Sequence, residues 1–237
     1  MTGTHSRRHL SSAARLGLTL RSVMLTPRAG YASAVVATER RVRTGERLPE
    51  GRTPYVLAAL GGAGAMCLWL KLGALAGWRT VGVRSFDLGI LFGALVAGAC
   101  VSLACQLTWG ALGSALSARL GGRARARDLR LVWGAAAFPQ VFVLLLVPMD
   151  LAVAGPPAFT AAPLGDSISM AWAALSVALG AALGVWSGWL FLRGMEVATN
   201  LRLRRAIIVA AGAALCVSAL VGAFAWAGTL VVSGAPS

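Results

Sequence analysis

Four polar side chains interrupt long apolar runs of this sequence and are the first candidates for chemistry. Lys71 and Asp150 carry charges, and Gln106 and Gln140 carry amides. A charge inside a membrane segment is a functional hypothesis by default, because burying it in lipid is costly. We interpret Lys71 and Asp150 as interfacial charges that reach headgroup water, although a contact between them is geometrically allowed. On this interpretation asparagine should serve nearly as well as Asp150. The two amides are expected to bond between helices.

The sequence lacks the residue patterns of the common catalytic sites. It has no HExxH, GxSxG or P-loop motif, and no paired acids on one helix face. Its two histidines, His5 and His9, lie near the N-terminus, and its four cysteines sit in apolar runs without a CxxC pair. Such cysteines are typical of small residues buried between helices rather than of a metal or redox site. We therefore expect a protein that is not an enzyme and needs no cofactor or metal.

The composition indicates a chain that crosses a membrane several times. Of the 237 residues, 57% are hydrophobic and only 13% are charged, whereas a soluble domain is about one quarter charged. A helix needs about 20 apolar residues to cross the hydrocarbon core. Five stretches reach this length and predict an all-α membrane protein, a five-span transmembrane helical bundle. They are residues 54–77, 87–116, 130–154, 168–192 and 206–233.

A basic N-terminal arm, residues 1–53, precedes the membrane domain, residues 54–237. The arm is either an amphipathic segment on the anionic inner leaflet or a flexible segment that only carries the positive charge. Thr26 and Pro27 resemble a cap and a first helical residue, and they predict a short helix to about Arg40.

The arginines predict the orientation. They gather in the arm and in the loops near 117–129 and 193–205, whereas the loop 155–167 contains no basic residue. The positive-inside rule then predicts an inner (cytoplasmic) membrane protein with its N-terminus in the cytoplasm and its C-terminus outside. The net charge of +14 does not indicate nucleic acid, because no aromatic residues alternate with the arginines. Candidate contacts for anionic inner-leaflet lipids or a partner protein are Arg123, Arg125, Arg127, Arg202, Arg204 and Arg205.

Glycines recur at a spacing that lets helices approach closely. Gly180, Gly184 and Gly188 share one face of the fourth predicted span, and Gly89 and Gly93 share one face of the second. Small residues promote helix association in lipid, where the hydrophobic effect does not. We expect these faces to pack within one chain, while a homo-oligomer is the alternative.

Proline marks the third predicted span. Pro139 removes one helix hydrogen bond and predicts a kink, which a bundle tolerates if neighbouring groups satisfy the freed carbonyl. Gln140 beside it is a candidate partner for that carbonyl. Pro148 marks the outer end of the same span, so the run is interpreted as one bent helix rather than two.

Three stretches resemble the Yip domain family, small multi-spanning membrane proteins named for their interaction with Ypt/Rab GTPases. They are LRSVMLTPRAGY (residues 20–31), RDLRLVWGAAAFPQVF (127–142) and GVWSGWLFLRGMEVATNLRLRRAIIVA (184–210). Their order and spacing, together with the five predicted spans, extend the resemblance over nearly the whole chain. The sequence lacks the long acidic or aromatic N-terminal region of eukaryotic members, so the resemblance is to the prokaryotic type.

These features predict a non-enzymatic membrane organiser or adaptor that binds other membrane proteins or lipids. The alternative is a small permease or channel, which would need a polar path through the bundle.

Overall fold

The computed structural model describes residues 21–43, 52–76, 88–160 and 165–215. These residues are mostly helical and contain no strand, so the predicted all-α class is confirmed for them. The elements are α2 (Pro27–Arg43), α3 (Thr53–Leu75), α4 (Leu88–Arg119), α5 (Ala126–Val153), the short 3-10 helix η2 (Pro156–Phe159) and α6 (Ser167–Thr199). Residues 21–25 and 203–215 are also helical.

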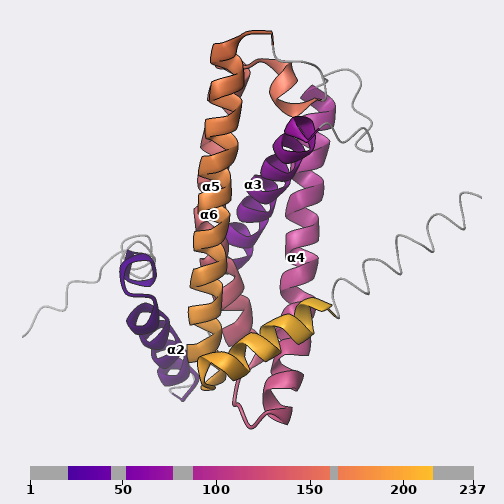
Figure 1. Cartoon of the computed structure of the whole chain (residues 1–237). Helices are drawn as coiled ribbons and strands as arrows, with labels where there is room; N and C mark the ends of the chain where they lie inside the picture. The colour runs from indigo at the N-terminus through magenta and orange to yellow at the C-terminus, as the bar shows by residue number, and fades with distance from the viewer. Residues whose placement is uncertain (1–20, 44–51, 77–87, 161–164, 216–237) are drawn as a thin grey trace, which may run out of the picture.

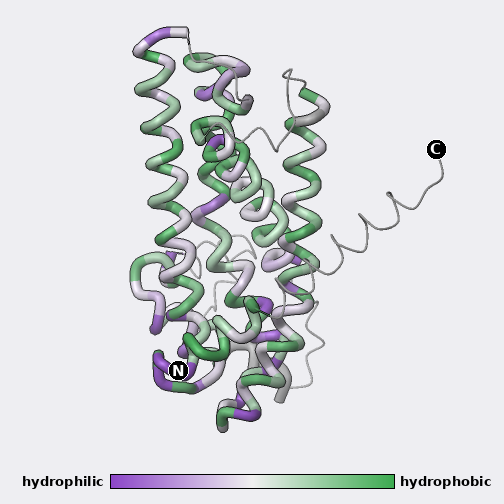
Figure 2. The backbone as a smooth tube through the Cα atoms, turned by 45° about the vertical axis from the view of Figure 1, so that its right-hand side comes forward, coloured by the Kyte–Doolittle hydropathy of each residue, from purple (hydrophilic) through white to green (hydrophobic). Residues whose placement is uncertain are grey.

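Four of the described helices are long and apolar enough to cross a membrane, namely α3, α4, α5 and α6. They form an elongated bundle in which α3 crosses obliquely between the others, while α2 lies outside α6 (Figure 1). The most extensive helix contacts join α3 to α5, α5 to α6 and α3 to α4. The long helices are hydrophobic along most of their length, and hydrophilic residues gather mainly at the lower end (Figure 2). This arrangement fits a protein embedded in a membrane.

The helix ends differ from the predicted ones. The third predicted span began at residue 130, whereas α5 begins at Ala126, and the fourth ended at residue 192, whereas α6 continues to Thr199. In this continuation Glu196, near the end of α6, pairs with Arg193 and with Arg28 of α2. Only residues 203–215 of the fifth predicted span are described, and the rest of it lies outside the described residues.

Both ends of α6 are capped. The Asp166 carboxylate accepts a hydrogen bond from the Ser169 backbone N–H at 3.1 Å, as an N-cap does. Hydrogen bonds from Ser169 hold the pKa of Asp166 below its ordinary value. At the other end Asn200 adopts the left-handed conformation, with φ 53°, which commonly ends a helix. The chain therefore turns away from the axis of α6 after Asn200.

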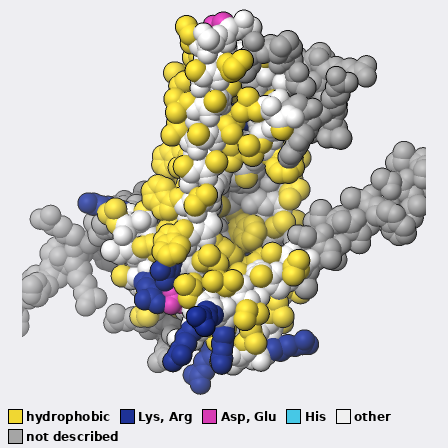
Figure 3. Space-filling model, in the orientation of Figure 1, with side chains coloured by type: hydrophobic (Ala, Val, Ile, Leu, Met, Phe, Trp, Pro, Cys, Tyr) yellow, Lys and Arg dark blue, Asp and Glu magenta, His cyan; other side chains and the backbone are white. Residues whose placement is uncertain are grey.

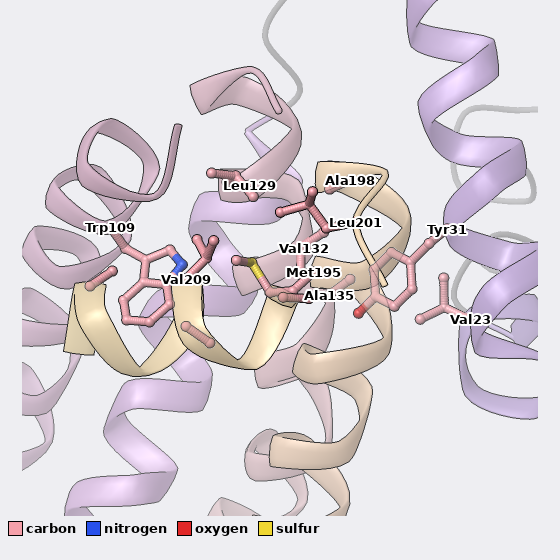
Figure 4. Packing of buried hydrophobic residues seen from close by; sticks show 13 residues of the cluster. Val23, Tyr31, Trp109, Leu129, Val132, Ala135, Met195, Ala198, Leu201 and Val209 are labelled. Atoms are coloured by element: carbon pink, nitrogen blue, oxygen red, sulfur yellow. The ribbon is translucent and has the colours of Figure 1, made fainter. Parts of the chain in front are cut away.

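The predicted short helix of the arm is present as α2, and it packs against α6. Tyr31 and Val23 are buried in a cluster with Met195 and Val132 (Figure 4). A Cβ atom at Gly194 would lie 2.8 Å from Cζ of Tyr31, so the missing side chain lets the tyrosine ring approach α6. The contact between Arg28 and Glu196 holds the same two helices together at the surface.

The Tyr31 hydroxyl gives a test of this packing. The side chain is fully buried, and its hydroxyl has no hydrogen-bond partner among the described residues. Burial also raises the pKa of Tyr31 far above its ordinary value. Burial removes the hydrogen bonds of this hydroxyl with water, and the protein supplies none in their place. Tyr31→Phe should therefore keep or slightly raise the melting temperature of the full-length protein in detergent. Tyr31→Ala should cost about 3 kcal/mol of unfolding free energy. Equal losses in both variants would mean that the hydroxyl makes a stabilising hydrogen bond.

Candidate functional site

A lateral groove of about 860 Å³ lies between α3, α4, α5, α6 and the helix 203–215. Its lining is almost entirely apolar and includes many glycine and alanine residues. Several lining residues, among them Trp69, Val101 and Ile207, are between 41% and 52% exposed, so the groove opens on the side of the bundle. In a membrane protein such a side faces lipid, and its occupant must be apolar.

Three aromatic rings from three helices form the wall near the lower end of this groove. The ring centroids of Trp109 on α4 and Phe191 on α6 are 5.2 Å apart, and those of Trp133 on α5 and Phe191 are 5.7 Å apart. Both pairs meet edge to face, a favourable arrangement. The Trp133 indole donates a hydrogen bond to the Ser102 hydroxyl at 3.4 Å. The aromatic contacts therefore fix α4, α5 and α6 around the groove.

The prolines lie inside one continuous helix, because α5 runs from Ala126 to Val153 through Pro139 and Pro148. The prediction of one span rather than two is confirmed. Pro139 has no N–H, so the carbonyl that it frees is that of Ala135, four residues earlier. The Ser187 hydroxyl of α6 donates to the next carbonyl, that of Ala136, at 2.5 Å, a contact between α5 and α6 that sequence reasoning missed. Gln140 is buried, and its side-chain oxygen has no hydrogen-bond partner among the described residues. The pairing of its amide N–H with the Ala135 carbonyl stays a prediction.

Of the three glycines predicted to share one face of the fourth span, two meet a neighbouring helix and one does not. A Cβ at Gly180 would lie 2.7 Å from Leu68, and one at Gly184 would lie 3.1 Å from the Gln140 amide nitrogen. These two glycines therefore face α3 and α5. Gly188 is exposed and lines the groove, with nothing among the described residues within 4 Å of its Cβ position.

The second predicted glycine face needs a correction. Gly89 and Gly93 are exposed on α4, and the Cβ position of Gly93 has open space around it. Gly93 thus supports no close helix contact within the described bundle. The reason is that α4 turns another face to α3, where a Cβ at Gly98 would lie 2.6 Å from the Gly62 carbonyl oxygen.

Lys71 and Asp150 form a buried ion pair, and the interpretation that they reach headgroup water is wrong. Their side chains are 3% and 1% exposed. The Lys71 ammonium also donates to the Ser176 hydroxyl at 2.9 Å, and the Trp172 indole donates to Asp150 at 3.1 Å. The Phe159 ring centroid of η2 lies 5.8 Å from the ammonium. The pair therefore joins α3, α5, α6 and η2 at one point.

Lysine and arginine side chains gather at the lower end of the bundle (Figure 3). At this end α4 leads into α5 and α6 leads into the helix 203–215 (Figure 1), and these two turns carry the six predicted contact arginines. Five are exposed and Arg127 is half-buried. The two segments that carry them touch, because the Arg123 backbone N–H donates to the Thr199 carbonyl at 3.2 Å. On α6, Arg193 lies over the Trp189 ring at 4.2 Å from its centroid. The structure thus brings arginines from two loops to one basic end.

Arg130, which the sequence did not single out, also lies at this end. A Cβ at Gly110 of α4 would lie 3.0 Å from its Cγ and Nε atoms. Its Nε is buried without a hydrogen-bond partner among the described residues. The sequence predicts that the third span begins at this residue, which puts Arg130 at the edge of the loop. In the structure α5 begins one turn earlier and draws Arg130 into the bundle.

No group of three histidine, cysteine, aspartate or glutamate side chains in the described parts of the chain could hold a metal ion. Comparison of the chain with protein-family models, curated proteins and solved structures finds no match.

Proposed function

We propose that this chain is a non-enzymatic, multi-pass protein of the inner membrane that binds another membrane component, a lipid or a membrane protein, and acts as an organiser or adaptor. The lateral apolar groove carries this proposal. A concave apolar site of this size is the default binding-site hypothesis in an uncharacterised protein. The groove lies among lipid-facing residues of the bundle, so its ligand would come from the membrane.

The resemblance to the prokaryotic type of the Yip domain family and the fifth span, residues 206–233, belong to this proposal as well. The resemblance supports it because that family consists of membrane proteins that act through their partners. The described helix 203–215 contributes Ile207, Ala210, Ala211 and Ala214 to the groove. The start of the predicted fifth span is therefore part of the binding surface.

The proposal is tested by filling the groove. Gly188 lines the groove, and its Cβ position has nothing among the described residues within 4 Å, so the side chain of Gly188→Leu would occupy space in the groove. Gly93→Leu is the matched control, because Gly93 has equally open surroundings and does not line the groove. Full-length protein extracted from its own membrane is analysed by native mass spectrometry.

We expect a bound lipid or protein of defined mass in the wild type and in Gly93→Leu, and its loss in Gly188→Leu. Identical bound components in all three proteins would refute the proposal.

A small permease or channel is the second candidate, and the buried ion pair favours it. Charges inside membrane segments often mark ion or proton pathways, and Lys71 and Asp150 are the most deeply buried charges among the described residues. The double replacement described in the Discussion separates a transport role from a structural one.

The proposed orientation places the basic end in the cytoplasm. Ser167 and Arg202 are both exposed, and they lie at opposite ends of α6. In a background without the four native cysteines, a membrane-impermeant maleimide should label Ser167→Cys in intact cells and leave Arg202→Cys unlabelled. Both variants should react once the cells are permeabilised. Labelling of Arg202→Cys in intact cells would reverse the orientation.

A further inference from the structure

We propose that the groove holds an acyl chain of an anionic phospholipid from the inner leaflet, with Arg130 and Arg204 binding its phosphate. This inference rests on the proposed function, in which the groove binds a membrane component, and it names the class of that component. Three observations carry it: an unpaired guanidinium nitrogen, a second arginine on the same side, and the limited size of the groove.

Arg130 stands one turn below the groove on α5. It precedes Trp133 by three residues and Ala137 by seven, and both of these line the groove. Residues at this spacing share a helix face. The Arg130 Nε is buried and lacks a hydrogen-bond partner among the described residues. Arg130 as a whole is only half-buried, and a phosphate oxygen is the acceptor that a guanidinium binds most strongly.

On the helix 203–215, Arg204 has the same spacing from groove-lining residues as Arg130 has on α5. It precedes Ile207 by three residues and Ala211 by seven, and both line the groove. Arg204 is exposed, as are its neighbours Arg202 and Arg205. Glu196, the acid at this end of α6, is already paired with Arg28 and Arg193. The positive charge at the basic end of the groove therefore favours an anionic headgroup.

The size of the groove favours an acyl chain over a transmembrane helix. The volume of about 860 Å³ lies in the range of about 300–1,000 Å³ that is typical of sites for small ligands. An apolar partner helix carries no anion for the arginines at the basic end, whereas an anionic lipid supplies both an apolar chain and a phosphate.

The test compares two lipids with the same acyl chains, phosphatidylglycerol and phosphatidylcholine. Each is titrated into delipidated full-length protein, and binding is followed by native mass spectrometry. Both lipids carry the phosphate, but the choline ammonium of phosphatidylcholine adds a positive charge next to the two arginines, so we expect the wild type to bind phosphatidylglycerol about tenfold more tightly. Arg130→Gln and Arg204→Gln should each weaken phosphatidylglycerol binding and reduce this preference, and the double variant should abolish the preference.

Arg119→Gln is the matched control, because Arg119 is exposed at the same end but lies ten residues from Trp109, the nearest groove-lining residue of α4. It should keep the full preference. Gly188→Leu should weaken the binding of both lipids, and Gly93→Leu should not. If Arg130→Gln lowers the melting temperature, Arg204→Gln alone decides the role of the headgroup.

Two results would overturn the inference: equal affinity for the two lipids in the wild type, or a full preference in the arginine double variant. If a bound protein is found instead and disappears in Gly188→Leu, the proposed function stands and the lipid assignment fails. If Gly188→Leu changes neither lipid binding nor the native component, both fail.

Discussion

Asp150→Asn should destabilise the bundle severely, lowering the free energy of unfolding by about 3–5 kcal/mol, the usual effect of breaking a buried ion pair. The ammonium of Lys71 would remain buried, with its side chain 3% exposed and only a neutral amide opposite it. The Ser176 hydroxyl, which accepts a hydrogen bond from Lys71, cannot neutralise the charge. This expectation reverses the interpretation of Asp150 as an interfacial residue. Thermal unfolding of the purified full-length protein measures it.

The double replacement Lys71→Met with Asp150→Leu is the control. Removing both charges leaves neither one unpaired, and apolar side chains of similar volume are often as stable as a buried ion pair. The double variant should therefore recover most of the melting temperature that Asp150→Asn loses. A wild-type melting temperature for Asp150→Asn would instead mean that the charge is neutralised elsewhere.

The same double variant separates the two candidate functions. If it is stable and complements a deletion strain that has a measurable defect, the ion pair is a structural link between α3, α5 and α6. If it reaches the membrane at normal levels and fails to complement, the charges act in transport and the permease becomes the first candidate.

Gly64→Ala should be the most damaging single methyl substitution in α3. A Cβ atom there would lie 2.0 Å from the Gln140 carbonyl oxygen of α5, a distance at which one backbone must move. We expect a loss of about 3 kcal/mol, at the upper end of the range for overpacked cores. The measurement is the melting temperature and the yield of folded protein in detergent.

Gly93→Ala is the matched control for Gly64→Ala. The Cβ position of Gly93 has nothing among the described residues within 4 Å, and alanine is the better helix former. This variant should match or slightly exceed the wild type in stability. A similar loss in the two variants would mean that the close contact between α3 and α5 does not limit the stability.

Four of the five predicted spans could be recognised because each is a long run with few charges, and its length and apolar composition identify it. The packing faces could not. The helices are apolar on all sides, so no polar face shows which residues point inward. Gly93 and Gly64 look equally suited to helix contact in the sequence, yet only Gly64 meets a neighbour. In soluble proteins the pattern of apolar and polar residues would have separated them.

Of the candidate site, only the part marked by charged residues could be predicted from the sequence. The basic end follows from the arginines of the two loops, which the structure brings together. The Lys71–Asp150 pair was recognised as geometrically allowed, but its burial depends on Trp172, Ser176 and η2. The groove requires five helices to meet. Such contacts depend on how distant segments pack, which local sequence does not specify.

The length of α6 has a consequence for its place in the membrane. From its cap at Asp166 to Arg193, which lies over Trp189, the helix extends about 40 Å at 1.5 Å per residue. The hydrocarbon core of a typical bilayer is about 30 Å thick. The core together with both headgroup regions is about 40–45 Å thick, and tryptophan and arginine together are typical of the boundary between hydrocarbon and headgroups. The stretch from Asp166 to Arg193 therefore fits the bilayer with its two polar ends among the headgroups. The last turns of α6, with Glu196 and its ion pairs to Arg28 and Arg193, then extend into water, where dissolved salt screens these pairs.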